Sequence, residues 1–283
     1  MLRKFIYLIV VVALTGVAQA QVLTTPSESD MYCGGVVTTQ RPPSEPYVIS
    51  GAESDVRTTF HQGNIVFISR GANQGVKVGD QFLVSRAVDE ALGYPWFVGQ
   101  ESLLKAMGQT YADLGRLRVV SVQPNTSSAE VVFACNYLQR GDLLQAFAER
   151  PAPQYKPDQA LDLFAARSGK AQAMIVTTKS FGQMAGQGTT VYVNLGSAQG
   201  VKVGDYFRVF RYQGDHSESV YAVKDTGYKL FGFGATPKPY KSSDLPRDIL
   251  GEGIVLRVGP NAATVLITSS RREIFAGDYV EIE

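Results

Sequence analysis

Few side chains in this sequence are spaced for catalysis or metal binding. The two histidines, His61 and His216, lie at unrelated places, and no His, Cys or Asp cluster has metal-ligand spacing. Cys135 and His61 could form a nucleophile pair, since such partners need only be close in space. We favour surface or loop positions for both histidines and a buried or oxidised Cys135. The sequence therefore predicts no enzyme, no catalytic residue, no metal and no cofactor.

A nucleotide site is not expected either. Ser168-Gly169-Lys170 ends like a phosphate-binding loop, but Phe164 stands where that loop requires a glycine.

Several charged residues occur twice at matching places. The aspartates are Asp80 and Asp205, then Asp142 and Asp278, and each follows a glycine. Such carboxylates could serve acid–base chemistry or calcium, but a position after a turn glycine favours turn stabilisation. The basic residues are Lys77 and Lys202, then Arg86 and Arg211. They alternate with apolar residues, so we expect them on an outward face, where they are candidates for partner contact.

Aromatic residues gather in two stretches outside the repeated motif. The first holds Trp96 and Phe97, and the second holds Tyr228, Phe231 and Phe233. Flat rings on loops suit sugar rings or proline-rich peptides, so these five are the candidate partner-binding residues. The alternative is that they cover the open ends of small barrels.

These residues are set in a duplicated unit. Residues 63–86 and 188–211 match at 13 of 24 positions with an offset of 125, and residues 114–142 match 250–278 with an offset of 136. The recurring residues are the apolar residues of the expected strands and the turn residues between them, and both kinds specify a fold. The expected turn residues are Gly71, Gly75, Gly79, Asp80, Gly196, Gly200, Gly204, Asp205, Gly277 and Asp278.

Short strands between closely spaced turn signals predict an all-β fold, with one small barrel or sandwich per copy. Between the two matched halves lies an excursion of 27 residues in the first copy (87–113) and 38 in the second (212–249). Such a difference is typical of loops. The first excursion contains a predicted helix over Glu101–Met107.

The chain divides into five parts. Residues 1–20 have the basic start, apolar run and Ala18-Gln19-Ala20 ending of a cleavable export signal. We expect an extended N-terminal segment at 21–46 unless Cys33 fixes it, repeats at 47–147 and 173–283, and a proline-containing linker at 148–172 with a short helix over Gln159–Ala166.

Charge and hydropathy limit the partners of the mature chain. Loss of Arg3 and Lys4 with the signal leaves 25 basic against 26 acidic residues. This balance lacks the excess of positive charge that is typical of nucleic-acid-binding proteins. No later stretch has the roughly 20 apolar residues of a transmembrane helix. Two cysteines in an exported chain favour a Cys33–Cys135 bridge, and two separate thiols remain the alternative.

The pattern G-S-x-x-G-V-K-V-G-D-x-F-x-V-x-R, followed by L-G-x-G-x-V and I-x-x-G-D-x-V, resembles exported bacterial envelope proteins. It is similar to the C-terminal domain of the flagellar assembly protein T and to the β-repeats of LysM-associated envelope proteins. The resemblance implies SH3-like barrels used for assembly or wall association. Together with the duplication and the export signal, it leads us to expect two tandem SH3-like barrels, each with a mid-domain insertion, in the periplasm or at the outer membrane. The expected function is a non-catalytic scaffold acting through protein–protein contacts. The alternative is a peptidoglycan- or glycan-binding module using the aromatic loops.

Overall fold

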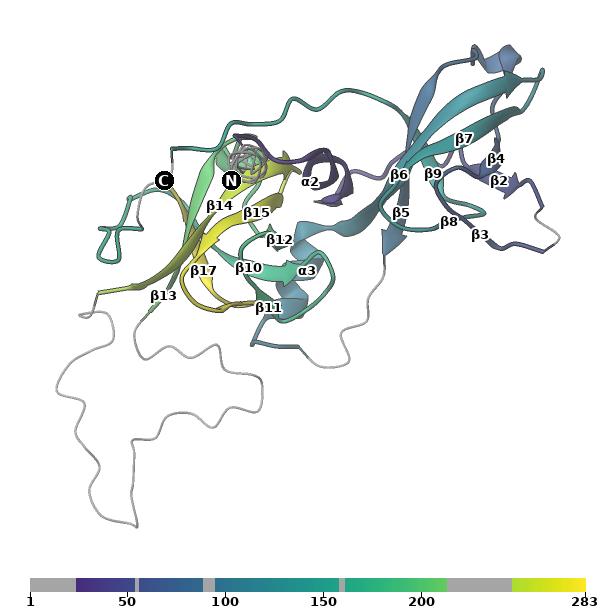
Figure 1. The fold of residues 1–283 in the computed structure, drawn as a ribbon. Helices are drawn as coiled ribbons and strands as arrows, with labels where there is room; N and C mark the ends of the chain where they lie inside the picture. Colours follow the sequence, from purple (N-terminus) through teal and green to yellow (C-terminus); the bar gives the residue numbers. More distant parts are fainter. Residues whose placement is uncertain (1–23, 54–55, 89–94, 158–160, 213–245) are drawn as a thin grey trace, which may run out of the picture.

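Most of the regular structure is β, as predicted. The computed structural model describes residues 24–53, 56–88, 95–157, 161–212 and 246–283 (Figure 1). The predicted export signal lies outside these residues, as do Tyr228, Phe231 and Phe233 of the second excursion.

The first repeat forms a sheet with the order β2-β4-β7-β6-β5-β9. Its elements are β2 (Val48–Gly51), β3 (Thr59–Phe60), β4 (Ile65–Ile68), the 3-10 turn η1 (Ala72–Gln74), β5 (Gln81–Val88), α3 (Gln100–Met107), β6 (Gln109–Val122), β7 (Ser127–Ala134), β8 (Leu138–Gln139) and β9 (Leu143–Ala146). The predicted helix in the first excursion is confirmed by α3.

The second repeat is a closed barrel with the corresponding order, β10-β12-β15-β14-β13-β17. Its elements are β10 (Gln172–Thr178), β11 (Met184–Ala185), β12 (Thr190–Val193), η2 (Ser197–Gln199), β13 (Tyr206–Arg211), β14 (Asp248–Val258), β15 (Ala263–Ser270), β16 (Ile274–Phe275) and β17 (Tyr279–Ile282). Each repeat has its own apolar core, with Phe82 and Phe207 at equivalent buried places.

The repeats differ in how their sheets close. In the second, β10 pairs with β17 over three residue pairs. In the first, the equivalent edges form one isolated bridge, Tyr47↔Leu143. They are also joined by backbone hydrogen bonds: the Val48 N–H donates to the Asp142 carbonyl at 2.9 Å, the Gly141 N–H to the Val48 carbonyl at 2.8 Å and the Leu144 N–H to the Pro46 carbonyl at 2.8 Å.

The repeated turn residues have the same geometry in both copies. Asp80 Oδ2 accepts the Lys77 N–H at 2.9 Å, and Asp205 Oδ2 accepts that of Lys202 at 2.8 Å. Gly71 is needed for another reason: a Cβ there would lie 2.1 Å from the Gln123 carbonyl oxygen. The repeated motif thus stabilises two turns in each repeat. Lys77 and Lys202 are both exposed, as predicted for an outward face.

The N-terminal segment is folded between the repeats and is not extended, which is the case that was expected if Cys33 fixed it. Residues 28–33 form α2 (Glu28–Cys33), capped by Ser27, and residues 36–38 form β1 (Val36–Thr38), which pairs with β6. The segment also binds the second repeat, because Tyr192 Oη donates to the Gly34 carbonyl and Thr264 Oγ1 to the Gly35 carbonyl, each at 3.0 Å.

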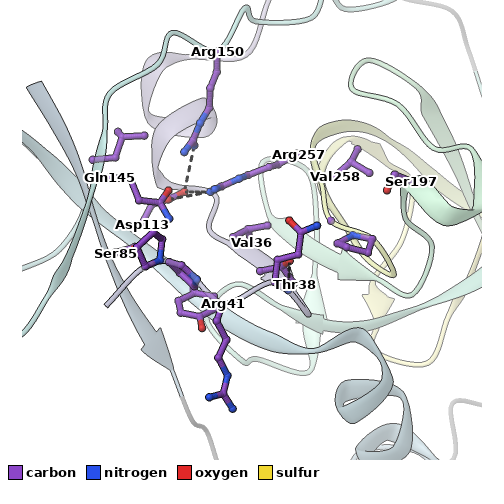
Figure 2. Close-up of a pocket in the computed structure, with 17 residues that line it drawn as sticks. Val36, Thr38, Arg41, Ser85, Asp113, Gln145, Arg150, Ser197, Arg257 and Val258 are labelled. Atoms are coloured by element: carbon purple, nitrogen blue, oxygen red, sulfur yellow. Dashed lines mark hydrogen bonds and ion pairs between the residues drawn. The ribbon is translucent and has the colours of Figure 1, made fainter. Parts of the chain in front are cut away.

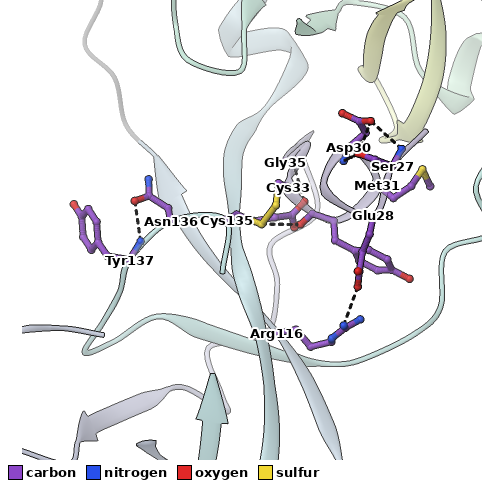
Figure 3. The surroundings of a disulfide bond; sticks show 12 residues. Ser27, Glu28, Asp30, Met31, Cys33, Gly35, Arg116, Cys135, Asn136 and Tyr137 are labelled. Carbon is purple, nitrogen blue, oxygen red and sulfur yellow. Dashed lines mark hydrogen bonds and ion pairs between the residues drawn. A yellow bond between two sulfur atoms is a disulfide. The ribbon is translucent and has the colours of Figure 1, made fainter. Parts of the chain in front are cut away.

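A Cys33–Cys135 disulfide fixes this segment to the first repeat (Figure 3). Of the two alternatives left by the sequence, the bridge is present. Glu28 of α2 adds an ion pair with Arg116 of β6, at 2.8 Å.

The linker runs along the second repeat without a helix in its described residues, so the short helix predicted over Gln159–Ala166 is not found there. It is held by specific contacts instead: the Lys156 N–H donates to Tyr206 Oη at 2.8 Å, and the Lys156 ammonium pairs with Glu252 and Glu283.

We predict that breaking the disulfide with a Cys33→Ser/Cys135→Ser double variant lowers the free energy of unfolding by about 2–5 kcal/mol. The reason is that the bridge closes a loop with a sequence separation of 102 residues, which restricts the unfolded chain. Urea unfolding of oxidised wild type against the variant measures this. Under reducing conditions the two proteins should unfold alike, and equal midpoints in oxidising buffer would contradict the prediction.

Candidate functional site at the junction of the repeats

The first excursion docks on the second repeat, so its aromatic residues are not an open surface. The Phe97 ring is 5% exposed and packs with Val176 and Tyr192, and Trp96 lies against the same cluster. Gln100 Nε2 donates to the Val176 carbonyl at 2.8 Å while its Oε1 accepts the Trp96 N–H. This corrects the prediction that Phe97 binds an outside partner; it is used inside the chain.

At the centre of the junction lies the buried carboxylate of Asp113, on β6 (Figure 2). Its Oδ2 accepts the N–H of Gly35 in the N-terminal segment at 2.9 Å. Arg257 of the second repeat reaches both carboxylate oxygens through Nη1, at 3.1 and 3.3 Å. Arg150 of the linker completes an ion pair at 3.6 Å. One side chain thus joins four parts of the molecule.

Arg150 is fixed by more than this ion pair. Its Nη1 donates to the Met31 carbonyl at 3.0 Å, its backbone N–H donates to Tyr32 Oη, and its guanidinium stacks over the Tyr32 ring. Burial and then the nearby charge of Arg257 lower the pKa of Arg150. Asp113 opposes both effects, so the two arginines depend on this carboxylate.

A cavity of about 440 Å³ adjoins the carboxylate. Its polar lining comes from all parts of the junction: Thr38, Gln40, Arg41, Ser85, Asp113, Gln145, Arg150, Ser197 and Arg257. Ser85 Oγ is buried and has no hydrogen-bond partner among the described residues. Three arginines against one carboxylate make this wall suited to an anionic group, and it contains no paired nucleophile and base.

A second charged feature is repeated, one per copy. Arg86 binds Asp142 through two bonds at 2.7 and 2.9 Å, and Arg211 binds Asp278 through two at 2.6 and 2.7 Å. Both aspartates are buried. The arginines were predicted to face outward as candidates for partner contact; instead, each guanidinium binds a buried aspartate of its own repeat. In the sequence, an arginine and an aspartate recur together in both copies, and this joint recurrence could have predicted the two ion pairs.

Glu281 is a fully buried carboxylate on β17 that connects the second repeat to the linker. Arg247 Nη2 binds it at 2.7 Å and also donates to the Ala165 carbonyl at 3.3 Å, and Arg208 approaches at 3.4 Å. Burial alone would raise the pKa of Glu281, but the hydrogen bond and charge of Arg247 outweigh it and hold that pKa below its ordinary value.

Among the residues that the structure describes, those first considered for chemistry are not brought together. His61 is exposed, and its backbone N–H donates to Asn64 Oδ1. His216 lies outside the described residues. Cys135 is bonded to Cys33, which overturns the thiol–histidine alternative. Within the described ranges, no three His, Cys, Asp or Glu side chains group as metal ligands, and no helix has the length and apolarity to cross a membrane.

No protein-family model and no curated protein matches the chain.

We predict that Asp113→Asn lowers the free energy of unfolding by about 1–3 kcal/mol. The substitution keeps the shape but removes the charge that Arg150 and Arg257 share. Chemical denaturation gives the value. Glu130→Gln, which breaks the more exposed Arg118–Glu130 pair, is the control and should change it by less than about 0.5 kcal/mol. Equal losses in the two variants would argue against a central role for Asp113.

Glu281 gives a pH-dependent prediction. Because its pKa is lowered by folding, its charge stabilises the native state above the unfolded pKa, and this contribution is lost as pH falls through the native pKa. Glu281→Gln should therefore destabilise the protein most at neutral pH, and its difference from wild type should shrink as the pH falls below about 4.5. Thermal unfolding across acidic pH tests this, and a pH-independent difference would refute it.

Proposed function

We propose that this chain is a non-catalytic structural protein of a bacterial cell envelope that acts as a scaffold for a protein assembly. In this proposal each repeat is an SH3-like barrel with a variable insertion, and the pair lies in the periplasm or at the outer membrane after export. The observation that most supports this proposal is the junction, where Asp113 and the packed first excursion hold one repeat against the other. A scaffold needs such a fixed relation between its binding faces.

Two features support this proposal. The Cys33–Cys135 disulfide suits an oxidising compartment beyond the cytoplasm. The recurring charged pairs Arg86–Asp142 and Arg211–Asp278 are satisfied within each repeat, as befits residues that maintain a fold. A glycan-binding role would now have to use surfaces other than Phe97.

The test is chemical crosslinking in envelope preparations followed by purification of the tagged chain. We expect a defined protein partner with wild type, and less of it with Asp113→Asn, because that variant loosens the junction without altering the outer surfaces. Glu130→Gln is the matched control and should recover the partner as well as wild type does.

Recovery of no protein with several crosslinker chemistries would contradict the scaffold proposal. Co-sedimentation of the purified chain with peptidoglycan in that case would favour the glycan-binding alternative.

A further inference from the structure

The duplication shows a buried place at which the first repeat differs from the second. Ser85 of β5 pairs with Asp113 of β6, and at the same register in the second repeat Phe210 of β13 pairs with Ile249 of β14. Phe210 is 0% and Ile249 1% exposed, so this position is an apolar contact in the second repeat. The first repeat therefore carries a hydroxyl and a carboxylate where the second carries two apolar side chains.

The same difference changes how the space beside the strands is filled. In the second repeat the Phe210 ring stacks on Tyr279, and the Arg247 guanidinium lies over it with Cζ 4.2 Å from the ring centroid. In the first repeat the smaller Ser85 stands at the equivalent place, and the junction cavity of about 440 Å³ lies beside it. A volume of this order accommodates a small organic molecule. The cavity is open to solvent, because part of its lining is exposed: Arg41, Pro43 and Ser197.

The hydroxyl of Ser85 is available to a ligand in this cavity (Figure 2). Ser85 is 8% exposed, and its Oγ has no hydrogen-bond partner among the described residues. A buried hydroxyl without a partner costs folding free energy. The second repeat avoids this cost with Phe210, whereas in the first repeat a polar group bound in the cavity satisfies the hydroxyl.

The charges around Asp113 favour one further negative group. Arg150 and Arg257 share this single carboxylate, so the cluster of three side chains carries one positive charge in excess. Both arginines reach Asp113 through Nη1 only, so a second carboxylate can approach their other N–H groups. Guanidinium groups bind carboxylates through paired, charge-assisted hydrogen bonds.

We propose that the junction cavity binds a small organic carboxylate. The carboxylate group accepts hydrogen bonds from Arg150, Arg257 and the Ser85 hydroxyl, and the apolar part of the molecule packs on Leu83 and Val258. A single negative charge balances the excess, which favours a carboxylate over a phosphate group with its higher charge at neutral pH. Because the lining comes from both repeats and the N-terminal segment, the bound molecule holds these parts together. This binding site goes beyond the scaffold proposal and does not depend on it.

The first experiment measures binding to the oxidised full mature chain by ligand-observed NMR. Acetate, succinate and benzoate are each compared with the neutral amide of the same shape, and inorganic phosphate is the further anion. We expect at least one acid to bind at least about tenfold more tightly than its amide, because the amide cannot balance the excess positive charge. Binding by none of the acids, equal binding of acid and amide, or tighter binding of phosphate than of every acid would overturn the proposal.

The second experiment places the binding in the cavity. Ser85→Phe introduces the residue of the second repeat and should abolish binding, since the ring fills the space. Ser85→Ala keeps the space but removes the hydroxyl, and it should weaken binding about three- to tenfold. Ser121→Phe and Ser121→Ala are the matched controls: Ser121 is exposed on β6 outside the cavity lining, so both should bind as wild type does. Unchanged binding in the Ser85 variants would refute the site, and the alanine variant decides the matter if the phenylalanine variant does not fold.

Discussion

The arrangement of the two repeats depends on one buried carboxylate. A charge removed from water must be matched by hydrogen-bond donors or opposite charge, and Asp113 finds these in the N-terminal segment, the second repeat and the linker. Because each donor comes from a different part of the chain, all of them have to be in place together. Apolar contact around Phe97 and Val176 buries non-polar surface between the repeats, and the directional bonds of the carboxylate favour one orientation.

The disulfide and the carboxylate constrain the same short segment from two sides. Cys33 is bonded to the first repeat, and two residues later the Gly35 N–H is bound by Asp113. Gly35 has a φ of +70°, and a Cβ there would lie 2.5 Å from Tyr192 Oη, so only glycine lets the segment pass so close to the second repeat. A segment without a core of its own is thereby ordered by the two domains that it separates.

The sequence allowed prediction of what is local or repeated. Strand alternation and the Gly-Val-Lys-Val-Gly-Asp turns predicted an all-β duplication, and the helix around Leu104 followed from its composition. It did not allow prediction of contacts between distant residues, such as Asp113 with Arg257 or Phe97 with the second repeat. An aromatic residue in a loop has the same local signature whether it meets a partner protein or a neighbouring repeat. The distinction depends on the relative placement of domains, which no spacing along the chain encodes.

The two copies also explain why an excursion can vary while the barrel does not. The turns and the Arg–Asp pairs act inside one repeat, so any change there must be compensated within that repeat, and both copies retain them. The first excursion acts on the second repeat, so its sequence is constrained by the surface it meets there.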